Sequence, residues 1–129
     1  MPVYSQQYNN WDYEPPMPVV QIALRASMRG KQSVSLLALV DSGSDATMLP
    51  MEVLQSIGAR FYRARRIRGI TGEPSTVDTY HISIILGPYT IHGIEAVALP
   101  NSSEAILGRD VLNQLELTLN GPAQETWVA

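Results

Sequence analysis

The stretch LLALVDSGSDATMLP, residues 36–50, changes abruptly from apolar to polar and decides how we interpret the chain. The apolar run ends at Asp41, small residues follow, and a second carboxylate, Asp45, comes shortly after. Gly43 lies between the two acids and permits backbone angles that other residues avoid. The pattern predicts a buried strand that presents the Asp41 carboxylate on a tight loop at the edge of the core.

Outward from this stretch, the sequence reads as a series of short strands. Residues 19–26 alternate apolar and polar side chains, as a half-buried strand does. Similar runs occupy residues 33–40, 59–68, 75–87, 89–100 (with Gly93 as a candidate break) and 115–120. Short helices are expected between Pro50 and Gly58 and again after Gly108. Strands and helices do not alternate along the chain as in βαβ proteins. We therefore predict an all-β fold, a closed or partly closed β-barrel with one or two short helices.

The length of 129 residues predicts a single domain. Residues 1–18 are rich in Asn, Gln, Tyr and Pro and are expected to form a mobile N-terminal arm. Docking of the aromatic residues of this arm is the alternative. We place the domain at residues 19–120 and a C-terminal tail at residues 121–129.

Composition excludes several classes of function. The chain has no Cys, which removes disulfides, thiolate nucleophiles and Cys-ligated zinc. A net charge of −3 does not indicate nucleic acid or anionic membrane as a partner. His81 and His92 lack further ligands at suitable spacing, and the glycines match no nucleotide-binding motif, so we expect no metal and no cofactor. No signal peptide or membrane span is seen, so a cytoplasmic location is expected.

Five of the nine basic residues lie in the predicted strand ARFYRARRIR, residues 59–68. One interpretation is a basic binding edge. The other is a solvated strand face whose arginines prevent edge-to-edge pairing, and we favour it.

Three segments together carry a resemblance to a known family. LVDSGSDAT, residues 39–47, resembles the active-site loop of the retroviral-type, or retropepsin-like, aspartic proteases. RGITGE, residues 68–73, lies where that family has a flap hairpin, and AILGRDVL, residues 105–112, resembles its apolar-apolar-Gly-Arg segment and following helix. The resemblance spans residues 19–120 and implies the retropepsin-like barrel fold.

The resemblance implies an aspartic endopeptidase. Two carboxylates about 3 Å apart share one proton, and so supply both a base for water and an acid for the peptide carbonyl. The chain holds Asp-Ser-Gly only once, so a complete dyad requires a homodimer whose two-fold axis passes between the Asp41 side chains. The expected partners are a second copy of the chain and a polypeptide substrate in extended conformation.

By carry-over from the family, Asp41 is the catalytic residue, and Ser42, Gly43, Asp45 and Arg109 support the active-site loop. Ser42 would brace the two loops across the dimer, and the Gly43 N–H would hold the Asp41 carboxylate. Asp45 would pair with Arg109, or the two would form an ordinary surface pair.

The substrate-binding flap would consist of Gly69, Ile70, Thr71 and Gly72. In the shortest viral relatives the chain termini interleave into a dimer sheet, an arrangement that the arm and Pro122 leave open here. The alternative function is a catalytically inactive retropepsin-like module that dimerises or binds peptide.

Overall fold

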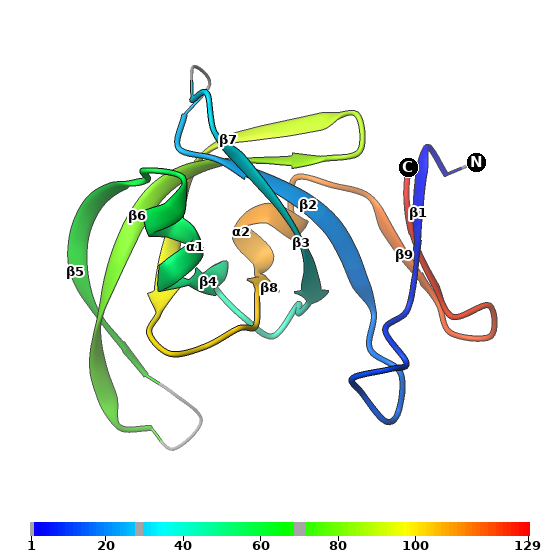
Figure 1. The fold of residues 1–129 in the computed structure, drawn as a ribbon. Coiled ribbons are helices and arrows are strands. Elements are labelled where there is room, and N and C mark those ends of the chain that lie inside the picture. Colours follow the sequence, from blue (N-terminus) through cyan, green and yellow to red (C-terminus); the bar gives the residue numbers. More distant parts are fainter. Residues whose placement is uncertain (1, 28–29, 69–71) are drawn as a thin grey trace.

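The structure, a computed structural model, describes residues 2–27, 30–68 and 72–129. Over these residues the chain is mostly β, with two short helices (Figure 1). The strands are β1 (Tyr4–Gln7), β2 (Val19–Arg25), β3 (Ser33–Val40), β4 (Met48–Pro50), β5 (Arg60–Arg68), β6 (Pro74–Leu86), β7 (Tyr89–Leu99), β8 (Ile106–Leu107), β9 (Leu117–Asn120) and β10 (Glu125–Val128). The helices are α1 (Met51–Ser56) and α2 (Arg109–Leu112).

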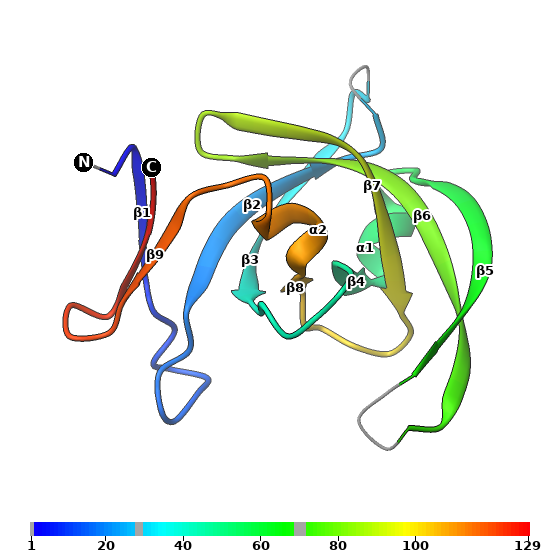
Figure 2. The ribbon, with the colours of Figure 1, turned by 180° about the vertical axis from the view of Figure 1, so that it is seen from behind.

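A hydrogen-bonded ring of strands forms the body of the molecule. Its order is β2, β3, β8, β4, β7 and β6, and a pairing of β6 back onto β2 closes it. Strand β5 pairs with β6 outside the ring, and the two curve away together as a ribbon (Figures 1 and 2). The prediction of an all-β, partly closed barrel with two short helices is therefore confirmed.

Strand β2 shows why this segment joins the core. Val20, Ile22 and Leu24 are fully buried, whereas Gln21 and Arg25 between and after them are exposed. Successive side chains of a strand point to opposite faces, so this alternation places three large aliphatic groups inside the ring. Each such group contributes roughly 1.5–3 kcal/mol when fully buried.

Strand β7 continues through Gly93, where the sequence indicated a candidate break. Ile82 pairs with Ile94 but Ile84 pairs with Ile91, so β7 contains one extra residue at this point. Gly93 has a φ of 69°, which is a left-handed conformation that glycine adopts without strain. The glycine thus makes a β-bulge that bends the strand while the pairing resumes on both sides.

Both predicted helices are present, and each follows a strand directly. Helix α1 begins after Pro50 and ends before Gly58, whose φ of 68° suits the left-handed turn that closes many helices. Helix α2 begins after Gly108. In the described ranges, no helix is long and apolar enough to cross a bilayer.

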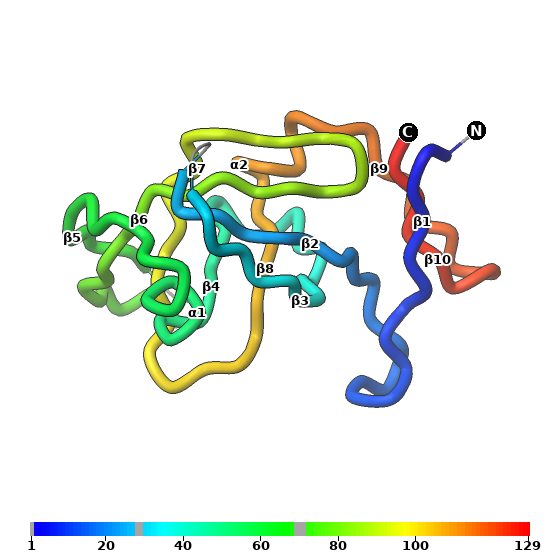
Figure 3. Tube along the Cα trace, turned by 45° about the horizontal axis from the view of Figure 1, so that its top comes forward, coloured from blue at the N-terminus to red at the C-terminus, as the bar shows by residue number. Residues whose placement is uncertain are grey.

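The two ends of the chain differ from the expectation of a mobile arm and a separate tail. Strand β1 pairs with β10, and β10 pairs with β9, in a sheet of their own that lies to one side of the ring (Figure 3). Tyr4 packs against the core, and the Tyr13 hydroxyl donates to Glu104 at 2.6 Å. That hydrogen bond is the main cause that raises the pKa of Tyr13 to about 12. The arm is therefore docked on the domain through Tyr4 and Tyr13, whereas Trp11 is exposed, and the termini pair within one chain.

A polar network anchors β5 to the rest of the sheet. Arg63 donates from Nε to Glu95 Oε2 at 2.9 Å and from Nη2 to Glu95 Oε1 at 3.1 Å. The hydroxyl of buried Thr79 lies 2.9 Å from the same Oε2. The hydrogen bond from Arg63 is the largest cause that lowers the pKa of Glu95, with a smaller contribution from Thr79.

We expect Glu95→Gln to lower the melting temperature at pH 7 by about 2–4 °C, because the ionised carboxylate loses its two-pronged contact. Because folding lowers the pKa of Glu95, its ionised carboxylate stabilises the folded protein at pH values above the pKa of an unfolded Glu, about 4.3. This stabilisation disappears as the pH falls through the pKa that Glu95 has in the folded protein. The difference between variant and wild type should therefore shrink below about pH 4. Thermal melts of both proteins from pH 3 to pH 7 test this, with the exposed Glu116→Gln as control. A difference that does not vary with pH would contradict it.

Candidate active site

The end of β3 delivers Asp41 to the surface. Leu39 and Val40 pair in parallel with Ile106 and Leu107 of β8, and the Asp41 N–H donates to the Leu107 carbonyl at 3.1 Å. The chain then turns, with the Ser44 N–H donating to the Asp41 carbonyl at 3.2 Å. Asp41, Ser42 and Gly43 are exposed in the single chain. The backbone of Asp41 is thus held by the sheet, while its carboxylate faces outward.

Gly43 holds the Asp41 carboxylate. Its N–H donates to Asp41 Oδ1 at 2.9 Å, and a Cβ added at Gly43 would lie only 3.1 Å from the same oxygen. Gly43 is not among the described glycines with positive φ. It therefore provides room for the carboxylate, and the unusual backbone angles that the sequence suggested are not needed.

Arg109 connects the start of α2 to the active-site loop. It forms an ion pair with Asp45, and its Nη1 donates to the Ser42 carbonyl at 2.6 Å. The Arg109 and Asp45 side chains are 42% and 90% exposed, so the pair has the energetics of a surface ion pair in the single chain. The hydrogen bond to Ser42 is what places the guanidinium against the loop next to Asp41.

A second, partly buried connection joins the same two segments and was not anticipated from the sequence. The Thr47 N–H donates to Asp110 Oδ2 at 3.1 Å, and the Thr47 hydroxyl donates to Asp110 Oδ1 at 2.8 Å. The Thr47 hydroxyl oxygen also accepts the Gly108 N–H at 3.2 Å. The only local signal was the carboxylate of Asp110 in the first turn of a helix, where acids are common.

Gly108 lets these two segments touch. A Cβ at Gly108 would lie 2.5 Å from the Ala46 carbonyl carbon, 2.6 Å from the Ala46 oxygen and 2.9 Å from the Ser44 oxygen. The Arg109 N–H donates to that Ser44 oxygen at 2.9 Å. The backbone after β8 therefore packs directly on the loop that follows Asp41.

A cleft of about 760 Å³ opens above Asp41. Its walls are the loop after β3, the strands β4, β7 and β8, and the last residues of β5. The lining residues are Asp41, Gly43, Ser44, Asp45, Ala46, Met48, Arg65, Arg66, Ile67, Arg68, Val97 and Ile106. The cleft thus combines one free carboxylate, an apolar floor and a row of arginines.

The last residues of β5 line this cleft, and β5 pairs with β6 in an antiparallel ribbon in which Arg68 lies opposite Pro74. Of the expected flap, Gly69, Ile70 and Thr71 lie outside the described residues. Gly72 has a φ of 80°, a conformation that favours glycine. The assignment of these residues to substrate binding stays a prediction.

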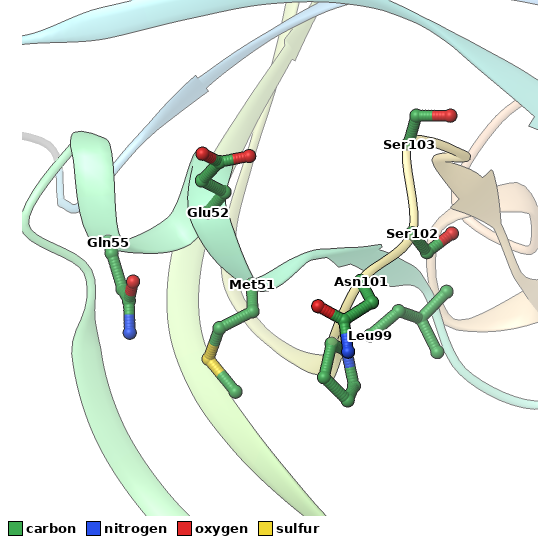
Figure 4. Close-up of a pocket in the computed structure, with 8 residues that line it drawn as sticks. Met51, Glu52, Gln55, Leu99, Asn101, Ser102 and Ser103 are labelled. Carbon is green, nitrogen blue, oxygen red and sulfur yellow. The ribbon is translucent and has the colours of Figure 1, made fainter.

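Other features of the described residues do not form a comparable site. A hollow of about 530 Å³ between α1 and residues 99–103 is lined by Met51, Glu52 and Asn101, among others (Figure 4). Asp41 is not among its lining residues. Within the described ranges, no three His, Asp or Glu side chains are grouped as metal ligands would be.

Comparisons with known proteins agree with the architecture. A family model described as "Aspartyl protease" matches residues 24–111, which include the Asp41 loop, β5 to β7 and the β8–α2 segment. No curated protein matches the chain.

Several solved structures share the fold. The EIAV protease complexed with the inhibitor HBY-793 has 20% identity and a TM-score of 0.59, over 81% of this chain and 90% of that one. A retropepsin-like aspartic protease from Rickettsia conorii has 15% identity and a TM-score of 0.57, over 98% and 93%. The simian foamy virus protease has 20% identity and a TM-score of 0.53, over 74% and 91%. With the family match over most of the domain, the chain belongs to the aspartyl protease family and has its retropepsin-like fold.

Proposed function

We propose that the protein is an aspartic endopeptidase whose catalytic dyad consists of two Asp41 carboxylates, one from each chain of a homodimer. The observation that carries the proposal is the placement of the single Asp-Ser-Gly. Asp41 lies on an exposed loop that lines a cleft of about 760 Å³, and the sequence holds no second copy of the motif. A second chain across a two-fold axis supplies the missing carboxylate.

The chemistry follows from one proton shared by two acids. The ionised carboxylate takes a proton from a water molecule, whose oxygen bonds to the peptide carbonyl carbon. The protonated carboxylate donates its proton to the carbonyl oxygen. When the carbon–nitrogen bond breaks, the amine nitrogen leaves with the proton that the first carboxylate took from water. One hydroxyl of the diol intermediate returns its proton to the second carboxylate as the carbonyl re-forms, so the dyad again holds one proton.

The neighbouring residues would hold the dyad in place. The Gly43 N–H donates to Asp41 Oδ1 at 2.9 Å and so fixes the orientation of that carboxylate. Arg109 and the partly buried Thr47–Asp110 contact position the loop that carries Asp41. Ser42 would brace its counterpart across the axis, and Gly69 to Gly72 would cover an extended substrate that pairs with the flap as an added strand.

We expect specific activity to fall on dilution, because each chain carries half of the site. When most of the protein is monomeric, a twofold dilution should lower the rate about fourfold, since the dimer forms from two chains. Cleavage of a denatured protein at acidic pH, with mass measured by sedimentation in the same samples, tests this. An inhibitor that mimics the transition state of aspartic proteases should suppress the activity.

A mixing experiment provides the control. Wild-type protein mixed with excess Asp41→Asn chain should lose activity, because mixed dimers contain one carboxylate. Constant specific activity in a demonstrated monomer would overturn the shared dyad. A dimer that binds the inhibitor and cleaves no peptide would support the alternative, a binding module without turnover.

A further inference from the structure

The wall of the cleft opposite Asp41 is basic. Three of the arginines of β5, Arg65, Arg66 and Arg68, line it together with Ile67. The other two have different positions, because Arg63 is bound to Glu95 and Arg60 lies at the far end of the strand, opposite His81. The five arginines of this strand therefore have three different positions. Arg63 is bound to Glu95, Arg60 lies at the far end of the strand, and the other three line the cleft.

The positive charge of this wall is largely uncompensated. Asp45 is engaged with Arg109. Arg65 Nη1 lies 3.7 Å from Glu95 Oε1, an oxygen that already accepts a hydrogen bond from Arg63. Among the residues that the structure describes, Arg66 and Arg68 form no ion pair, and both are exposed. The cleft thus presents Arg66 and Arg68 without an ion pair, and Arg65 with a long ion pair to a shared carboxylate, against the single unpaired carboxylate of Asp41.

Burial alternates along the last four residues of β5 and so separates their side chains onto two faces of the strand. Arg65 and Ile67 are half-buried, whereas Arg66 and Arg68 are exposed, so the first two lie on the inner face and the other two on the rim. Residues two apart on a strand are separated by about 6.6 Å, the same spacing as alternate side chains of an extended peptide. Three further apolar residues, Met48, Val97 and Ile106, line the same cleft as Ile67.

We propose that the cleft selects extended peptides in which an Asp or Glu side chain lies two residues from an apolar one. The apolar side chain would enter the pocket at Ile67, and the carboxylate would meet Arg65, with Arg66 and Arg68 attracting it from the rim. A planar guanidinium binds a carboxylate with two parallel hydrogen bonds, which a neutral amide does not reproduce. This inference rests on the proposed function, because it names the substrate class of that site.

The test uses three peptides that differ only at one position, which carries Glu, Gln or Lys two residues from a Leu. For the wild-type protein we expect kcat/KM to fall about fivefold from Glu to Gln, as one partly exposed ion pair would produce, and further to Lys. The Glu preference should weaken between 50 mM and 500 mM salt, since exposed charges are screened.

Combining Arg65→Gln, Arg66→Gln and Arg68→Gln should remove the preference for Glu over Gln. The matched control Arg60→Gln removes the same charge from the same strand outside the cleft and should keep it. If the triple variant does not fold, Arg66→Gln with Arg68→Gln alone, both at exposed positions, should reduce the preference.

The outcomes separate this inference from the proposed function. Equal cleavage of the three peptides, or an unchanged preference in the variants, would overturn the inference while the protease assignment stands. If no peptide is cleaved, the proposed function fails, and fluorescence anisotropy of the labelled peptides decides on the cleft itself. Tighter binding of the Glu peptide would then support the inference, and equal binding of all three would overturn it.

Discussion

Replacing Asp41 by Asn should abolish peptide hydrolysis and leave the fold intact. Asn is close to Asp in size and its side-chain oxygen still accepts the Gly43 N–H, which lies 2.9 Å from Oδ1 in the wild type. It neither takes a proton from water nor shares one with a partner carboxylate. Because both acid and base are lost in a dimer of variant chains, we expect the rate to fall by at least about a thousandfold.

The loss of activity in Asp41→Asn must be distinguished from a loss of folding. Circular dichroism, melting temperature and solution mass of Asp41→Asn should match those of the wild type, because Asp41 is exposed in the single chain. Asp12→Asn, a substitution of the same kind in the N-terminal arm, should cleave at the wild-type rate. An Asp41→Asn protein that keeps more than about one hundredth of the wild-type rate would rule out the proposed mechanism.

Replacing Gly108 by Ala should have the largest effect on stability. The added Cβ would overlap the Ala46 carbonyl group at 2.5 and 2.6 Å and the Ser44 oxygen at 2.9 Å. All three atoms belong to the backbone, so no side-chain rotation relieves the overlap. We expect a loss of about 3 kcal/mol or more in the free energy of unfolding, at the upper end of overpacking effects.

The same substitution should also reduce activity, because the displaced segment is the loop that follows Asp41. Urea unfolding of Gly108→Ala, compared with Gly121→Ala, isolates the effect. A Cβ at Gly121 would have no described neighbour within 4 Å, so this control should unfold near the wild-type midpoint. Equal midpoints for the two variants would show that the β8–α2 segment moves away from the loop without loss.

Local pattern in the sequence was sufficient for the long strands of the domain, the two helices and the position of Asp41, but not for β1, β4 and β10. Alternation along Val19–Arg25 predicted which residues of β2 are buried, because the period of two is a property of the strand itself. Pro50 and Gly58 bounded α1 because each restricts or permits particular backbone angles at its own position. The apolar run that ends at Asp41 predicted a carboxylate at the edge of the core for the same local reason.

Pairing between distant segments was decided only by the tertiary structure. The sequence did not indicate that Thr47 bonds to Asp110, that β1 pairs with β10, or that β6 closes the ring on β2. Nor did it separate Arg63, bound to Glu95, from the arginines that face the cleft.

The physical reason is the range of the interactions. A hydrogen bond between residues 63 positions apart leaves no periodic trace in either segment, since each donor or acceptor is satisfied by whichever partner the packing brings to it. The choice among five arginines likewise depends on the curvature of β5 relative to the Asp41 loop. The sequence by itself therefore determined the family, the long strands of the domain and the candidate catalytic carboxylate, and the packing of distant backbones decided which side chains hold and surround it.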